Sequence, residues 1–296
     1  MKIAIIGRGA IGTLYGQLFE KGHQDVVFLV DVDRKKRYEA NPLICNGKPV
    51  NFQYETQTDS VDLLFISTKY SGLPSAIEQA KDSIDAHTII VSALNGIVSE
   101  EELRKAFPKN KVIRTIVQGM DSTYLHNQCT YKVVGELLFG ADEKDQMEAC
   151  QCLERLYTSC QIPHRWVEDI VKEQWNKLML NCGINQTCAA YYTTYGGIKV
   201  DGPLQDIYMK AMLEVKAVAN AQNIPITDAD VQHWFDVMEP LSNEGMPSMR
   251  QDIIAHRKTE LALFSGTVVP IAKKLGIQTP VLEDLARRIR TIEAAF

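Results

Sequence analysis

The sequence predicts an α/β fold in two parts: an N-terminal part built on a mostly parallel sheet, and an all-helical C-terminal part. Short runs of apolar and β-branched residues alternate with helical stretches up to about residue 168, which is typical of a parallel sheet with helices on both faces. Beyond that point the β-branched runs stop and long helical stretches follow. A chain of 296 residues has the length of two ordinary domains. We therefore expect one domain over residues 1–168 and a second over residues 169–296.

The beginning of the chain contains the sharpest local pattern. Residues 2–6 form a short apolar run, which predicts a strand buried on both faces. A helical stretch over residues 13–21 and a second apolar run over residues 26–30 follow. Between the first strand and the helix lies a G-x-G-x-x-G motif, made of Gly7, Arg8, Gly9, Ala10, Ile11 and Gly12.

Each glycine of this motif has a physical reason. The first permits a tight turn, the second lets a pyrophosphate approach the backbone, and the third lets the helix pack closely on the sheet. The phosphates then lie against the free N–H groups of the helix N-terminus. We therefore expect a Rossmann-type domain whose six motif residues bind a dinucleotide. The alternative is a glycine turn that serves another ligand.

The remaining strands and helices follow from the same patterns. Apolar runs predict strands over residues 61–67, 88–92, 112–117, 131–135 and 136–140. Helical spacing between Gly and Pro breaks predicts C-terminal helices over residues 169–192, 204–222, 228–239, 249–275 and 281–295.

Composition and charge exclude several classes of protein. The 32 Lys and Arg against 37 Asp and Glu give a net charge of −5, so we expect no nucleic-acid binding by bulk charge. No apolar run reaches the ~18 residues of a membrane helix, and the N-terminus lacks a signal-peptide core. We therefore expect a cytoplasmic protein without membrane contact. The seven cysteines form no C-x-x-C pair and the six histidines are scattered, so we expect reduced thiols and no metal.

The residue after the second strand bears on the choice of cofactor. Asp31 follows the motif at the position where a carboxylate would bind the ribose 2′-hydroxyl of NADH and repel the 2′-phosphate of NADPH. The basic cluster over residues 34–37 offers the opposite interpretation, because it could pair with a 2′-phosphate. Asp31 favours NADH, and NADPH stays open.

Polar residues also follow two further strands. Lys69 comes after the strand expected over residues 61–67, and Asn95-Gly96 comes after the next strand. Because open α/β sheets bind ligands at the carboxyl ends of their strands, both are candidate cofactor-binding residues. An ordinary turn or surface position is the alternative for each.

The second part of the chain contains the candidate catalytic residues. Lys177, Asn181 and Asn185 are spaced to share one face of an α-helix within apolar sequence, which is typical of a pocket wall. Ser248 follows Pro247, which is well placed to begin a helix. Glu260 then falls about three turns into the helix expected over residues 249–275. A buried carboxylate there could partner a lysine, whereas an exposed one would be an ordinary surface charge.

Taken together, these residues resemble the ketopantoate reductase family. The resemblance runs along the whole chain: the glycine motif, Lys69, Asn95-Gly96, the Lys177-x-x-x-Asn181-x-x-x-Asn185 helix, and the segment from Ser248-Met249-x-Gln251-Asp252 to Thr259-Glu260. It implies a Rossmann domain, a helical domain and a cleft between them. One departure is Val30-Asp31, where NADPH-using members commonly have an arginine.

The resemblance also implies roles for individual residues. Lys177 would protonate the new alkoxide, and Glu260 would bind the substrate hydroxyl and orient the lysine. Asn95 and Lys69 would lie near the nicotinamide and the cofactor, with Asn95 also beside the substrate. The remaining substrate contacts would come from Asn181, Asn185 and Ser248.

The expected activity is the NAD(P)H-dependent reduction of 2-dehydropantoate to D-pantoate, a step of pantothenate and coenzyme A biosynthesis. One alternative is an NADH-dependent D-2-hydroxyacid dehydrogenase that acts on other 2-keto acids. Another is a non-catalytic nucleotide-sensing protein on the same fold, although sensing needs no proton donor such as Lys177. A small 2-keto acid is the expected partner, and the family implies a homodimer.

Overall fold

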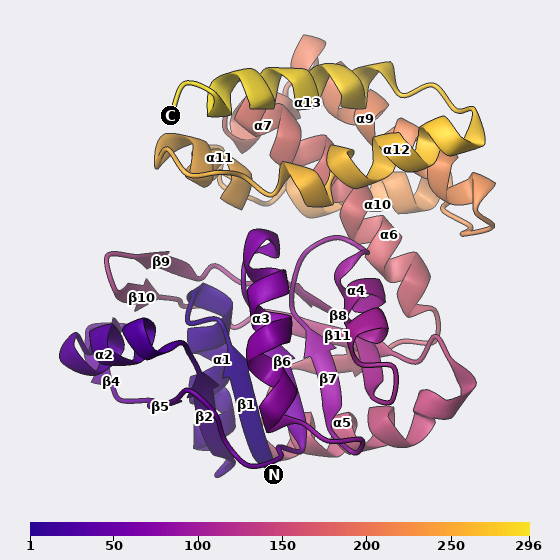
Figure 1. The fold of residues 1–296 in the computed structure, drawn as a ribbon. Helices are drawn as coiled ribbons and strands as arrows, with labels where there is room; N and C mark the ends of the chain where they lie inside the picture. Colours follow the sequence, from indigo (N-terminus) through magenta and orange to yellow (C-terminus); the bar gives the residue numbers. More distant parts are fainter. The chain divides into compact units, whose positions relative to one another are not determined.

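The computed structural model describes residues 1–296, and the chain forms two compact units (Figure 1). The first unit contains Met1–Asn95 and Ser99–Ile170, and the second contains Gly96–Val98 and Val171–Phe296. The domain boundary expected between residues 168 and 169 stays a prediction.

The first unit is built on an eight-stranded sheet. Its strands are β1 (Lys2–Ile6), β2 (Asp25–Leu29), β5 (Gln53–Glu55), β6 (Leu63–Ile66), β7 (Ile89–Ser92), β8 (Lys111–Gln118), β11 (Glu136–Gly140) and β12 (His164–Trp166). Their order across the sheet is β5-β2-β1-β6-β7-β8-β11-β12. The strands from β5 to β8 are parallel and have the order of a doubly wound sheet, while β11 runs antiparallel to β8. This arrangement confirms the predicted α/β class.

Helices cover both faces of the sheet. They are α1 (Ala10–Lys21), α2 (Val32–Ala40), α3 (Leu73–Ala80), α4 (Ser99–Ala106) and α5 (Met147–Ser159). Tyr15 and Phe19 of α1 and Tyr157 of α5 are fully buried on one face. Leu73 of α3 and Leu103 of α4 are fully buried on the other face, which is the near side in Figure 1. Burial on both faces explains why the parallel strands appear in the sequence as continuous apolar runs.

A second, four-stranded sheet completes this unit, and the sequence analysis does not predict it. Its strands are β3 (Leu43–Cys45), β4 (Lys48–Val50), β9 (Thr123–Leu125) and β10 (Gln128–Thr130), in the order β4-β3-β10-β9. The expected strand over residues 131–135 is wrong, because these residues connect β10 to β11 without pairing. Gly135, with a left-handed φ of 75°, ends the extended backbone there.

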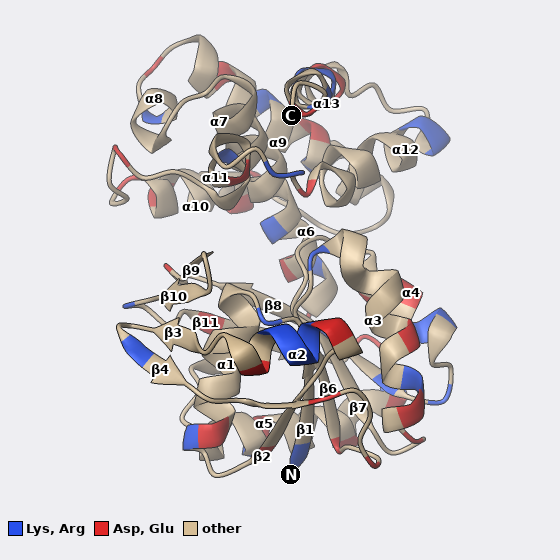
Figure 2. Ribbon diagram, turned by 60° about the vertical axis from the view of Figure 1, so that its left-hand side comes forward, with Lys and Arg blue, Asp and Glu red and all other residues tan.

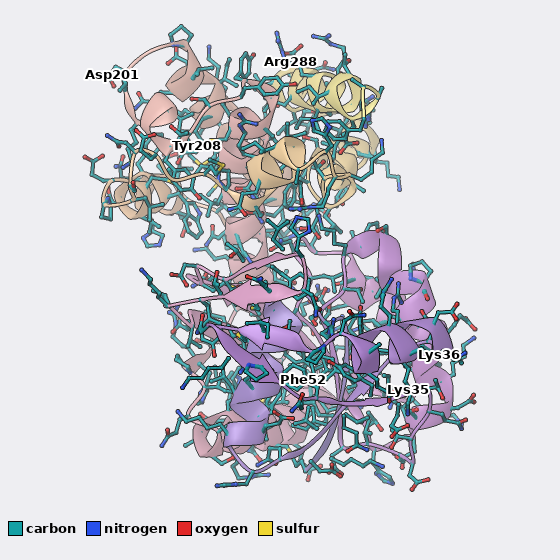
Figure 3. All side chains as sticks on the ribbon, turned by 90° about the vertical axis from the view of Figure 1, so that its left-hand side faces the viewer. Lys35, Lys36, Phe52, Asp201, Tyr208 and Arg288 are labelled. Carbon is teal, nitrogen blue, oxygen red and sulfur yellow. The ribbon has the colours of Figure 1, made fainter.

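The second unit is helical, as predicted. Its helices are α6 (Ile170–Leu180), α7 (Gln186–Ala190), α8 (Tyr195–Lys199), α9 (Pro203–Ala221), α10 (Asp228–Met238), α11 (Ser248–Ile254), α12 (Ser265–Leu275) and α13 (Pro280–Glu293). A π-helical turn, Asn181–Asn185, joins α6 to α7. The central helix α9 packs against this turn, α12 and α13, and it buries Tyr208 and Met212 (Tyr208 is labelled in Figure 3). None of the helices combines the length and the apolar character needed to cross a membrane.

The helix expected over residues 249–275 is broken in the structure. α11 ends at Ile254, and a 3₁₀ turn over Leu261–Leu263 precedes α12. The cause is the backbone of His256, whose φ of 48° is left-handed and cannot continue an α-helix. Glu260 therefore lies immediately before the 3₁₀ turn and not three turns inside a helix.

Two glycines let α1 pack onto the end of β1. A Cβ atom on Gly12 would lie 1.8 Å from the carbonyl oxygen of Gly7 and 2.6 Å from the Ser67 Oγ. Gly7 has a φ of 114°, which L-residues rarely adopt. Gly9 differs from both, because its φ is −87° and a Cβ there would meet no atom within 4 Å. Packing therefore requires the first and third glycines of the motif, but not the second.

This difference predicts opposite effects of the same substitution on stability. Gly12→Ala should destabilise the protein by about 1–3 kcal/mol, because its methyl group forces α1 away from the loop. Gly9→Ala should leave the stability unchanged within about 0.5 kcal/mol. Urea denaturation without added ligand measures both variants, and equal midpoints would contradict the prediction.

Candidate active site

Four of the predicted site segments lie at the carboxyl edge of the parallel sheet. The glycine motif follows β1, Asp31 follows β2, and Lys69 and Asn95 follow β6 and β7. Because these four strands are adjacent and parallel, their carboxyl ends meet at one edge. β2 lies on one side of β1 and β6 on the other, so the glycine motif lies at the topological switch point, where open α/β sheets bind ligands.

The glycine motif fits the pyrophosphate of a dinucleotide. Gly9 precedes α1 and offers no side chain to its first N–H groups, which begin with those of Ala10 and Ile11. The first turn of α1 also contains no acidic residue, so the positive end of the helix dipole is not offset there. The space next to the Gly9 Cα is open. An anion can therefore approach the backbone closely at this point.

Asp31 has a structural role that the sequence analysis does not include. It caps α2: one carboxylate oxygen accepts a 2.7 Å hydrogen bond from the Arg34 backbone N–H, and the other lies 3.1 Å from the Arg34 guanidinium. The Asp31 side chain is 54% exposed. Its charge therefore faces solvent and is partly neutralised by a neighbour.

The basic cluster of residues 34–37 lies on α2, which carries charged residues of both signs (Figure 2). Lys35 makes a 2.6 Å ion pair with Glu55 of β5, whereas Lys36 is exposed (both lysines are labelled in Figure 3). One of the four cations is thus tied to the edge strand of the sheet.

Lys69 and Asn95 occupy different positions along the sheet edge. Lys69 is exposed and precedes a 3₁₀ turn over Tyr70–Gly72. Asn95 is half-buried in the loop between β7 and α4. Both belong to the first unit.

In the second unit, the structure brings Lys177 and Glu260 together. Both side chains are half-buried, and they interact electrostatically. Burial lowers the pKa of Lys177 to about 8, and the negative charge of Glu260 opposes this by raising it. A lysine with such a pKa is largely protonated at neutral pH but releases its proton more readily than an ordinary lysine. This pair is therefore suited to donate a proton to a developing oxyanion.

The π-helical turn, which begins four residues after Lys177, carries two amide side chains. The Asn185 Nδ2 donates a 3.3 Å hydrogen bond to the Asn181 Oδ1. Both residues are at least nine-tenths buried, and the Asn181 Nδ2 has no hydrogen-bond partner. A buried donor without an acceptor is costly, so a ligand oxygen would satisfy it. The sequence spacing assumed a regular α-helix, and π-helical turns are frequent at functional sites.

Ser248 is placed less decisively. It is the exposed first residue of α11, and this helix packs against α7 and the π-helical turn. The helix that contains Ser248 therefore lies against the turn that contains the two asparagines, but Ser248 itself makes no hydrogen bond to them.

The side chain of Arg8 has surroundings that the sequence does not reveal. It is buried, and its guanidinium contacts Tyr38, Tyr54 and Asn127, which come from three separate segments. The one signal for this environment in the sequence is that a large, charged residue occupies a motif position that needs no glycine.

In neither unit are three His, Cys, Asp or Glu side chains arranged to hold a metal ion.

Comparisons with known proteins cover both units. Residues 3–137 match the family described as Ketopantoate reductase PanE/ApbA, and residues 169–293 match its C-terminal region. A 2-dehydropantoate 2-reductase of Lactococcus lactis subsp. lactis is 26% identical and covers 99% of this chain and 98% of the relative. One from Streptococcus pyogenes serotype M1 is 24% identical over 100% of this chain and 99% of the relative.

Solved structures show the same fold. A D-mandelate dehydrogenase with NADH and anilino(oxo)acetate has a TM-score of 0.90 at 21% identity, covering 100% of this chain and 99% of that one. A PanE/ApbA family ketopantoate reductase from Ralstonia eutropha JMP134 has a TM-score of 0.86 at 22% identity with the same coverage. Since the family matches span the sheet unit and the helical unit alike, this chain belongs to the ketopantoate reductase PanE/ApbA family of NAD(P)H-dependent 2-keto acid reductases.

Proposed function

We propose that this protein reduces 2-dehydropantoate to D-pantoate, a step that supplies pantothenate and coenzyme A biosynthesis. The observation that carries the proposal is the half-buried Lys177–Glu260 pair, whose lysine has a pKa of about 8. Family membership and full-length relatives with this activity support the choice of substrate. A purely nucleotide-sensing protein would have no use for a lysine tuned in this way.

The cofactor site we propose is the carboxyl edge of the sheet. The backbone of residues 7–12 would hold the pyrophosphate, Asp31 the adenosine ribose, and Lys69 and Asn95 the nicotinamide half. When bound, the reduced nicotinamide supplies a hydride to the keto carbon of the substrate.

The proton, in this proposal, comes from the second unit. As negative charge develops on the carbonyl oxygen, the Lys177 ammonium attracts it and donates a proton to it. Glu260 keeps the lysine charged and accepts a hydrogen bond from the substrate hydroxyl. Asn181, Asn185 and Ser248 would bind the remaining polar groups of the substrate, and the unpartnered Asn181 Nδ2 supports this assignment.

A second candidate keeps the chemistry and changes the substrate. This candidate is an NADH-dependent D-2-hydroxyacid dehydrogenase that acts on other 2-keto acids. The fold match to a D-mandelate dehydrogenase supports it, as does Asp31, which favours NADH. Steady-state assays with NADH or NADPH decide between the two, using 2-dehydropantoate, phenylglyoxylate and simple aliphatic 2-keto acids. A highest kcat/KM with 2-dehydropantoate supports the first function. No turnover of any 2-keto acid would refute both.

Substitution of the proposed acid should affect chemistry more than binding. Lys177→Ala should lower kcat by about 10²–10⁴-fold with little change in cofactor affinity, because the ammonium acts on charge that appears in the transition state. Lys210→Ala, at an exposed position of α9, is the control. Glu260→Ala should raise KM for 2-dehydropantoate more than for a keto acid without a hydroxyl, because it removes the acceptor of the substrate hydroxyl. A near-normal kcat in Lys177→Ala would place the proton donor elsewhere.

The lowered pKa of Lys177 predicts the pH profile. Because the protonated form is the active acid, kcat/KM should fall above about pH 8 as Lys177 loses its proton. Glu260→Gln removes the charge that raises this pKa, so in that variant the fall should begin at a lower pH. Rate measurements from pH 6 to 10 with both enzymes test this, and an unshifted profile would disprove the coupling.

The capping role of Asp31 requires a careful test of cofactor preference. We expect NADH to be preferred, because a carboxylate repels a 2′-phosphate. Asp31→Asn removes the charge but keeps an oxygen that can cap α2, so it should raise the NADPH/NADH ratio of kcat/KM at least about tenfold. Asp33→Asn, in the same helical turn, is the matched control. A ratio unchanged by Asp31→Asn would mean that Asp31 only caps the helix.

A further inference from the structure

Arg8 is a buried cation inside the glycine motif. Its side chain is only 7% exposed, and its guanidinium carbon lies 3.4 Å from the centroid of the Tyr38 ring. The guanidinium donates hydrogen bonds to the Tyr54 Oη at 2.8 Å, to the Tyr124 Oη at 3.4 Å and to the Asn127 Oδ1. These partners belong to α2, β5, β9 and the β9–β10 turn. Three stretches that are distant in the sequence, namely α2, β5 and the β9–β10 hairpin, thus hold one side chain.

None of these partners carries a negative charge. All are phenol oxygens, an amide oxygen or an aromatic ring, and the Arg8 Nε has no hydrogen-bond partner. Burying a cation without a counter-charge is costly. A purely structural brace would not need this charge, because a neutral amide could also donate to Tyr54 and Asn127. The charge therefore indicates a further, anionic partner.

The position of Arg8 in the chain indicates that this anionic partner is a phosphate group. Arg8 precedes Gly9, which faces open space, and α1 begins with free N–H groups at the next residue. A cation and the positive end of a helix therefore occur at the same loop, and both favour a phosphate group. We propose that the Arg8 side chain binds a phosphate of the dinucleotide and so supplies the positive charge of this site. The inference rests on the proposed cofactor site and adds a side-chain role to it.

Two phosphates of a dinucleotide could satisfy Arg8. One is the 5′-phosphate of the adenosine half, common to NADH and NADPH, and the other is the 2′-phosphate of NADPH. Three probes distinguish them by titration calorimetry: adenosine, 5′-AMP and adenosine 2′,5′-bisphosphate. Arg8→Met removes the charge at similar length, Arg8→Gln keeps neutral donors, and Arg8→Lys keeps the charge. Arg155→Met, at an exposed position of α5 in the same unit, is the matched control.

We expect Arg8→Met and Arg8→Gln to weaken 5′-AMP binding about 10- to 100-fold and to leave adenosine binding unchanged. In Arg8→Lys, 5′-AMP binding should be weakened less. Added salt should weaken 5′-AMP binding more in the wild type than in Arg8→Gln. A loss confined to the 2′,5′-bisphosphate would instead assign Arg8 to the 2′-phosphate. Equal loss for adenosine and 5′-AMP, or no loss at all, would overturn the inference. Failure of the wild type to bind NADH, NADPH and all three probes would refute the cofactor site itself.

Discussion

The close approach of α1 to the loop after β1 is the constraint on which the sheet unit depends. The space between the Gly12 Cα and the Gly7 carbonyl cannot hold a single methyl group. This contact fixes where the first helix begins and therefore where its free N–H groups point. It also fixes Arg8 and Gly9, which lie between the two crowded glycines. One short backbone contact thus determines both the packing of the layer and the geometry of the proposed phosphate site.

The sequence predicts the fold well wherever elements are long and buried on both faces. The parallel strands appear as apolar runs, and the change to helical spacing near residue 168 separates the two kinds of architecture. The small sheet escapes prediction because its strands have three residues each, too few to show alternation. Its central pairing places Cys45 opposite Cys129, and only the folded chain brings such distant residues together. The break at His256 is not predicted for another reason: histidine adopts a left-handed backbone more often than most residues, but this signal is too weak to end a helix in the sequence analysis.

The candidate site shows the same division. Lys177 and Asn181 can be selected from the sequence because their spacing places both on one face of a helix. Glu260 is selected through the resemblance to the family, since its expected place three turns inside a helix is wrong. The environments of these residues cannot be predicted in this way, since the pKa of Lys177 depends on burial and on a carboxylate from a distant segment. For Asp31 the sequence allows two interpretations. An aspartate before a helical stretch is an ordinary capping signal, and this interpretation competes with that of a cofactor ligand.

The division of the chain between the two units determines what happens when the chain is cut or its halves are expressed separately. Gly96–Val98 belongs to the second unit although it lies within the sequence of the first, and a Cβ on Gly96 would be 3.3 Å from the Leu263 Cβ. The backbone consequently passes between the units three times, after Asn95, Val98 and Ile170. A protease cut near residue 170 would leave Gly96–Val98 attached covalently to the N-terminal fragment and packed only non-covalently with the rest of the second unit. Separate expression of the halves would therefore deprive the second of a piece of its own structure.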